Sequence, residues 1–103
     1  MKLSIIIPAF NEEKEIGPCL ESVSQACADH PDSPEIIVVD NNSDDATATI
    51  ARDSGASVVY EPINQISRAR NRGARRATGE WLLFIDADSR LARESYADLR
   101  ESL

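Results

Sequence analysis

Short apolar runs alternate with segments of helical hydrophobic spacing along this chain, and the alternation repeats four times. The apolar runs cover residues 3–9, 35–39, 57–60 and 81–85. They are rich in Ile and Val and lack regular polar alternation, which is typical of parallel strands covered on both faces. The pattern therefore predicts four strands of one parallel sheet.

Residues 13–28, 44–54, 67–77 and 93–103 carry apolar side chains at helical spacing and are predicted to be helices. Pro18 fits the first of them only if it lies in the first turn. Gly55 and Gly79 follow the second and third segments, at positions where glycine commonly ends a helix. In the third segment, small residues at 69, 73 and 77 form a stripe that can lie close to the sheet.

Four strand–helix units without a repeat or a linker predict an α/β fold, a Rossmann-like parallel sheet flanked by helices, in one domain over residues 1–103. Right-handed crossovers leave few strand orders, and the commonest doubly wound arrangement gives 3-2-1-4. Ligands of such folds bind beyond the carboxyl ends of the strands, where the order reverses. The residues that follow strands 1, 2 and 4 are therefore the candidate site.

Polar and acidic residues follow all three strands, at residues 8–13, 40–44 and 86–89. Ser43 or Asp44 is predicted to cap the second helix rather than to contact a ligand. Asp86 and Asp88 would repel each other without a cation, and an extended segment would point both to one side. Two carboxylates that share a site with substrate phosphates suit Mg²⁺ or Mn²⁺. A plainer alternative is that this acidic rim only caps helices.

The distribution of charge narrows the choice of ligand. The chain of 103 residues has a formal net charge of −7, which disfavours a nucleic-acid partner, yet five arginines crowd into residues 68–76. Local positive charge indicates a small anion. Neither glycine-rich phosphate-binding motif occurs, so a diphosphate would need the metal and basic side chains. Arg70, at a different helical angle from the other four, is expected either to turn toward the ligand or to be solvated with them.

Cellular location is predicted from the apolar runs and the cysteines. No run approaches the roughly 20 residues of a membrane span, and the N-terminus lacks the pattern of a signal peptide. Cys19 and Cys27 would lie about 12 Å apart along a helix, beyond disulfide reach. We expect free thiols and a cytoplasmic protein.

Four segments together resemble a known family: residues 5–13 (IIIPAFNEE), 36–45 (IIVVDNNSDD), 69–74 (ARNRGA) and 84–88 (FIDAD). In this order and spacing they are similar to glycosyltransferase family 2, inverting enzymes with the GT-A fold. The resemblance covers essentially the whole chain and implies the N-terminal, nucleotide-sugar-binding half of that fold, hence a truncated domain. It also implies a UDP-, GDP- or dTDP-sugar as the donor.

The resemblance further implies roles for individual residues. Asp86-Ala87-Asp88 matches the D-x-D motif, in which Asp88 binds the cation that bridges the diphosphate and Asp86 lies near the metal and the ribose. The residues implied in nucleotide-sugar binding are Pro8, Ala9, Phe10, Glu12, Asp40, Asn42, Arg70 and Asp86.

The chain departs from the family pattern after Asp88. No residue matches the carboxylate that acts as general base or the acceptor-binding half, so the catalytic residue and the acceptor stay unassigned. Trp81 is expected in the core rather than at an acceptor. We expect donor binding without efficient transfer by this chain alone, and self-association through apolar faces that the other half would cover. The alternative is a nucleotide-binding or interaction module without catalysis.

Overall fold

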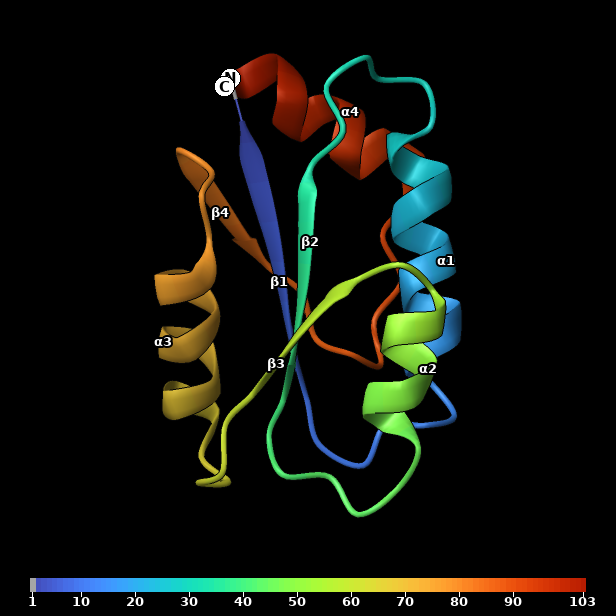
Figure 1. Cartoon of the computed structure of the whole chain (residues 1–103). Helices are drawn as coiled ribbons and strands as arrows, with labels where there is room; N and C mark the ends of the chain where they lie inside the picture. The colour runs from blue at the N-terminus through green and yellow to red at the C-terminus, as the bar shows by residue number, and fades with distance from the viewer. Residues whose placement is uncertain (1) are drawn as a thin grey trace.

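The computed structural model describes residues 2–103 and has a four-stranded parallel sheet at its centre (Figure 1). The strands are β1 (Leu3–Ala9), β2 (Glu35–Asp40), β3 (Ser57–Tyr60) and β4 (Trp81–Phe84). Their order is β3-β2-β1-β4, with Ile6 of β1 paired to Ile37 of β2 and Phe84 of β4. The predicted fold class and strand order are confirmed.

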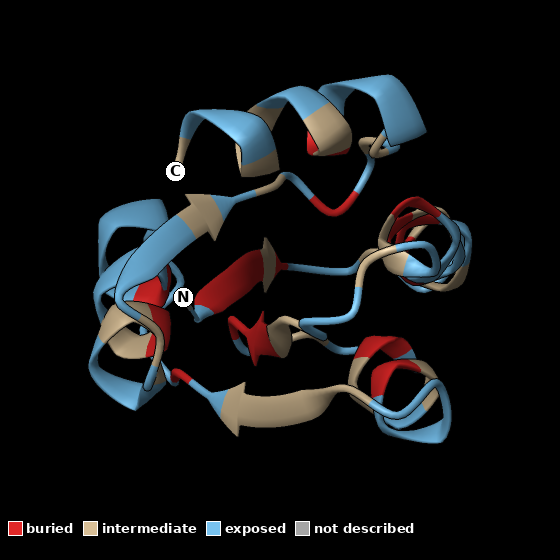
Figure 2. Cartoon of the chain, turned by 90° about the horizontal axis from the view of Figure 1, so that it is seen from above, coloured by how far each residue is buried: buried red, intermediate tan, exposed pale blue. Residues whose placement is uncertain are grey.

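The four helices are α1 (Ile16–Cys27), α2 (Thr47–Asp53), α3 (Ile66–Arg76) and α4 (Arg93–Ser102). Helices α1, α2 and α4 lie on one face of the sheet and α3 lies on the other (Figures 1 and 2). Helices α1 and α2 begin three residues later than the spacing predicts, and Pro18 therefore lies in the first turn of α1, where a proline is tolerated.

Each face of the sheet has its own apolar core. On one face, Ile5 and Ile7 of β1 pack with Val23 of α1 and Tyr96 of α4. On the other face, the core is formed by Ile6, Ile37, Val39 and Ala69. Central strand β1 is buried on both faces because α1 and α4 cover one face and α3 covers the other, while β2 and β4 flank its edges.

The edge strand β4 is less covered than its apolar sequence predicts. Trp81 is 46% exposed, and Leu82 and Phe84 are also exposed. Helix α3 packs over β1 and β2, so β4 lies beyond its cover. The expectation of a core role for Trp81 is therefore wrong, because an apolar run alone does not distinguish an edge strand from a central one.

Two further expectations concern the thiols and the membrane. Cys19 and Cys27 are free, as predicted, and Cys19 is fully buried. Within residues 2–103, every helix is too short or too polar to span a bilayer.

Candidate functional site

A cleft of about 400 Å³ opens at the carboxyl ends of β1 and β4, next to the start of α3. It is lined by Pro8, Ala9, Phe10, Glu12, Asn41, Asn64, Ile66, Asp86, Ala87 and Asp88. Six of the residues implied by the resemblance thus surround one cleft, at the edge of the sheet where the strand order predicts a ligand.

The two aspartates lie on a tight turn rather than on an extended segment. The backbone N–H of Ser89 donates a hydrogen bond to the carbonyl oxygen of Asp86 at 2.9 Å. The expectation of an extended Asp86–Asp88 segment is therefore wrong, although both residues still line the cleft. The turn brings them there because it reverses the chain directly after β4.

The buried thiol of Cys19 contacts this turn. Its sulfur lies 3.8 Å from the carbonyl oxygen of Asp86 and donates to it. Burial raises the pKa of Cys19 to about 11; Arg90 opposes the rise, and Asp88 and Glu12 add to it. At neutral pH the thiol is therefore protonated and remains a donor.

Glu12 brings a third carboxylate to the cleft. Its backbone N–H donates to the Thr47 hydroxyl at 2.9 Å. The pKa of Glu12 is raised, first by burial and then by the nearby charges of Asp88, Glu15 and Asp45. Negative charge is thus concentrated on one side of the cleft, and a cation there would relieve it.

Other polar residues of the rim join the β1–α1 loop to the β2–α2 loop. The backbone N–H of Asn11 donates to Ser43 Oγ at 2.9 Å, and the N–H of Asp44 donates to Asn11 Oδ1 at 2.8 Å. The N–H of Glu13 donates to Asp45 Oδ2 at 3.2 Å, and Glu13 Oε2 accepts the N–H of Ala46 at 3.0 Å. Asn11 accommodates this with a φ of 51°, a left-handed conformation that asparagine tolerates.

The prediction that Ser43 or Asp44 caps the second helix is wrong. Helix α2 begins after Ala46, which gives no side-chain cap. Instead, Asp45 accepts bonds from the backbone N–H and the hydroxyl of Thr47. Ser43 Oγ accepts the N–H of Asn11 instead, and Asp44 is joined to Asn11 through its backbone N–H.

Three of the implied binding residues lie outside the lining of the cleft. Asp40 is buried and accepts the N–H of Ser43 at 3.0 Å. Asn42 has a φ of 66° and accepts the Tyr60 hydroxyl at 2.7 Å. The Arg70 guanidinium lies 5.3 Å from the centre of a phenylalanine ring in β4. Their roles toward a ligand stay predictions.

Asn41 is a site residue that sequence reasoning missed. It is buried, lines the cleft, and its Nδ2 donates to the carbonyl oxygens of Glu61 at 3.1 Å and Ile63 at 2.6 Å. These bonds fix the segment that carries Asn64 and Ile66 to the cleft. Asn41 was among the residues predicted to follow the second strand. No sequence signal marks Asn64 and Ile66, because only the path of the chain between β3 and α3 brings them to the cleft.

Comparison with known proteins identifies the chain. The family model described as "Glycosyl transferase family 2" matches residues 4–103. The chain belongs to this family.

Relatives of this family 2 domain include enzymes of known structure. It is 37% identical over 95 residues to the PGL/p-HBAD biosynthesis glycosyltransferase of Mycobacterium bovis, covering 85% of this chain and 36% of that protein. S. aureus TarS 1-349, solved in complex with UDP, is 33% identical with a TM-score of 0.82, and the match covers 98% of this chain and 31% of that one.

A third relative was solved with a metal. Glucosyl-3-phosphoglycerate synthase from Mycobacterium tuberculosis, in complex with Mn²⁺, UDP and glucosyl-3-phosphoglycerate, is 32% identical with a TM-score of 0.72. The match covers 84% of this chain and 33% of that one. The chain spans about a fifth to a third of the length of curated relatives that it matches, from 22% to 36%.

The acidic residues of the cleft offer part of the coordination shell of a hard divalent cation. Asp86 and Asp88 offer carboxylate oxygens, which Mg²⁺ and Mn²⁺ prefer. Among residues 2–103 there is no cluster of three or more His, Cys, Asp or Glu side chains arranged to hold a metal. A site of this kind is completed by ligand phosphates and water.

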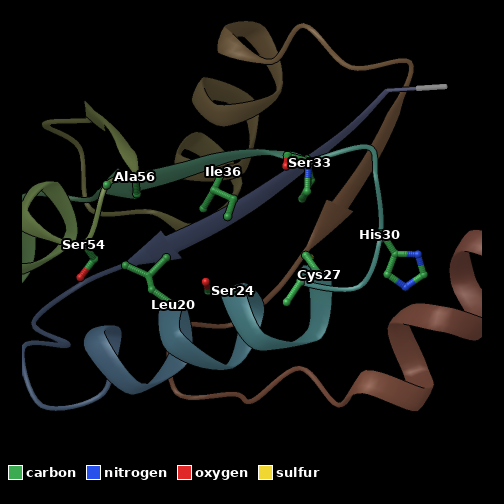
Figure 3. A pocket seen from close by; sticks show the side chains of 11 residues that line it. Leu20, Ser24, Cys27, His30, Ser33, Ile36, Ser54 and Ala56 are labelled. Atoms are coloured by element: carbon green, nitrogen blue, oxygen red, sulfur yellow. The ribbon is translucent and has the colours of Figure 1, made fainter.

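A second hollow, of about 340 Å³, lies at the opposite end of the sheet (Figure 3). Its walls come from α1, the loop after it, the start of β2 and the segment before β3, and include Leu20, Cys27, His30 and Ile36. The lining contains no carboxylate, arginine or lysine. It therefore lacks the charged groups that a diphosphate and a hard cation prefer, and the acidic cleft is the better candidate for these ligands.

Proposed function

We propose that this family 2 domain binds a nucleoside-diphosphate sugar with Mg²⁺ or Mn²⁺ in the acidic cleft, and so forms the donor-binding part of a sugar transferase. The observation that carries the proposal is the convergence of Glu12, Asp86 and Asp88 on one cleft at the carboxyl ends of β1 and β4. The choice of ligands is supported by the relatives solved in complex with UDP and with Mn²⁺ and UDP.

In this proposal Asp88 and Asp86 bind the cation through their carboxylates. A divalent cation, when bound, offsets the negative charge of the diphosphate and of the leaving nucleotide. Phe10 is 44% exposed beside the cleft, and its ring offers a face on which a nucleotide base can stack. Pro8 and Ala9 form the wall at the end of β1.

The remaining implied residues have supporting roles in the proposal. Asp40 holds the turn after β2 through the N–H of Ser43, and Asn42 anchors that turn to β3 through Tyr60. Arg70 reaches a bound nucleotide only by leaving the ring of Phe84, because it does not line the cleft in the present arrangement.

Transfer to an acceptor also requires a base that removes the proton of the attacking hydroxyl. The three carboxylates that line the cleft are Glu12, Asp86 and Asp88, and the two aspartates are assigned to the cation. We assign the base to none of the described residues. The proposed function of the 103-residue chain is therefore donor binding, with the acceptor left open.

The test is calorimetric titration of the purified chain with UDP and with GDP, each in the presence of Mn²⁺ and of a chelator. We expect binding that needs Mn²⁺, is lost in Asp88→Asn and is retained in Asp44→Asn. Asp44 is a matched control because it is an exposed aspartate of the rim that does not line the cleft. Equal binding by folded Asp88→Asn, or binding without metal, would overturn the proposal.

A second assay separates a donor-binding part of an enzyme from an inert module. The chain is incubated with UDP-glucose and Mn²⁺, and release of UDP is followed over time. Slow, Asp88-dependent hydrolysis by water is expected from a site that stabilises the leaving diphosphate. Tight UDP binding with no hydrolysis would favour the non-catalytic module.

A further inference from the structure

Helix α3 carries five of the chain's eleven basic residues and no acidic one. The rest of the chain is strongly acidic, since the net charge is −7. Ala69 and Gly73 face the sheet, whereas the outer side of α3 is open to solvent (Figure 2). The helix therefore presents a basic surface on an otherwise acidic molecule.

Three of these arginines, Arg68, Arg70 and Arg75, form no ion pair in the described part of the chain, and Arg70 instead lies over the ring of Phe84. Arg72 pairs with Glu61 at 3.3 Å and Arg76 pairs with Glu35 at 3.4 Å. Arg68 and Arg75 are exposed and form no ion pair within residues 2–103. Their guanidinium groups are free to bind oxygen-rich anions.

The arginines border two shallow hollows that share Arg75. One, of about 350 Å³, is also lined by Arg68, Asn71 and Glu61, whose carboxylate is paired with Arg72. The other, of about 390 Å³, is also lined by Tyr60, Arg72 and Arg76. The basic surface can thus receive more than one anionic group at the same time, spaced along the helix.

Large apolar side chains are exposed in the segment that leads into this helix. Tyr60 is 53% exposed, Ile63 43% and Ile66 61%. A free phosphate or a nucleic acid gains little from exposed isoleucines. A membrane interface uses both features, because basic groups attract anionic lipid headgroups while apolar and aromatic side chains enter the headgroup region.

We propose that α3 and residues 60–66 form a docking surface for a bilayer that contains anionic phospholipids. Arg68 and Arg75 bind the lipid phosphates, and the exposed side chain of Ile63 inserts between the headgroups. Ile66, at the start of α3, lines the acidic cleft, so docking of the segment before it holds the cleft near the bilayer. The inference goes beyond donor binding and does not depend on it.

The experiment measures binding of the 103-residue chain to vesicles of phosphatidylcholine alone and of phosphatidylcholine mixed with phosphatidylglycerol, by flotation. We expect binding only to the anionic vesicles, weakened by added salt. An arginine near an anionic surface raises affinity roughly fivefold, so the double variant Arg68→Gln/Arg75→Gln should bind about 25-fold more weakly.

The matched control is Arg52→Gln/Arg93→Gln, which removes the same charge from α2 and α4 and should bind like the parent chain. Ile63→Ser should also weaken vesicle binding, because a purely electrostatic attraction would not need this side chain. Equal loss in both double variants would overturn the proposal, since it would reflect net charge alone.

Two further arms use inorganic diphosphate and a single-stranded oligonucleotide as probes. If either one binds through Arg68 and Arg75 while anionic vesicles do not, the surface is a soluble-phosphate or nucleic-acid site and the membrane proposal is wrong. Circular dichroism of every variant verifies that it is folded.

Discussion

Replacing Gly73 by alanine tests how closely α3 packs on the sheet. An alanine Cβ at this position would lie 2.4 Å from Cγ2 of Ile6 and 3.0 Å from Cγ2 of Val39. Both neighbours are fully buried, and their branched Cβ atoms restrict them to few rotamers. Ile6 cannot turn away without disturbing its other contacts, so α3 must move off the sheet.

Two effects of opposite sign determine the size of the change. Alanine is favoured over glycine in a helix interior by about 1 kcal/mol. Adding a methyl group to a well-packed core costs about 1–3 kcal/mol, and a contact as short as 2.4 Å belongs to the upper part of that range. We expect the free energy of unfolding to fall by about 1–2 kcal/mol, which lowers Tm by roughly 5–15 °C.

The assay is urea unfolding followed by circular dichroism, with Gly17→Ala as the matched control. A Cβ at Gly17 would lie 3.6 Å from Cγ2 of Ile50, which is an ordinary contact. This variant should gain up to roughly 0.5–1 kcal/mol from helix propensity alone. If Gly73→Ala is as stable as Gly17→Ala, the close approach of α3 to β1 is refuted.

Three other variants test the framework of the site and the exposed edge. Glu35 accepts bonds from Thr78 and Ser4, which hold its pKa below the usual 4.5 despite its burial, so Glu35→Gln should cost about 1–2 kcal/mol at pH 7. Because the wild-type advantage is present above that pKa, it should disappear in unfolding curves recorded as pH falls below about 4.5. Asn41→Ala removes the donor for two loop carbonyls and should cost about 1–3 kcal/mol by urea unfolding and weaken UDP binding by calorimetry; unchanged values would contradict its role. Leu82→Lys on the exposed edge strand should reduce any concentration-dependent association seen by sedimentation, and an unchanged sedimentation profile would point to another face.

The sequence predicts the strands well because a buried strand is defined by its own apolar residues. All four strands end within one residue of the predicted positions, and their order follows from crossover handedness. The starts of α1 and α2 are less predictable. They depend on bonds such as that from Glu12 N–H to Thr47, which join residues 35 positions apart. The exposure of Trp81 is likewise a property of the whole sheet rather than of its strand.

The carboxylates that line the cleft differ from the other carboxylates at this edge of the sheet in how much hydrogen-bonding capacity they have left. Backbone N–H groups at the start of a helix need acceptors. Before α1 and α2, Asp45 accepts the N–H groups of Glu13 and Thr47, and Glu13 accepts the N–H of Ala46. The turn after β4 ends several residues before α4, so Asp86 and Asp88 have no helix start to satisfy.

Within residues 2–103, the carboxylate oxygens of Asp86, Asp88 and Glu12 accept no hydrogen bond from another protein group. A carboxylate already bonded to backbone N–H groups has little left to offer a metal, whereas these three retain most of their acceptor capacity. Their shared cleft raises the pKa of Glu12 and leaves repulsion that a cation can remove. Composition marks the whole rim as acidic, but only the pattern of satisfied acceptors separates the residues that stabilise the loops from those available for chemistry.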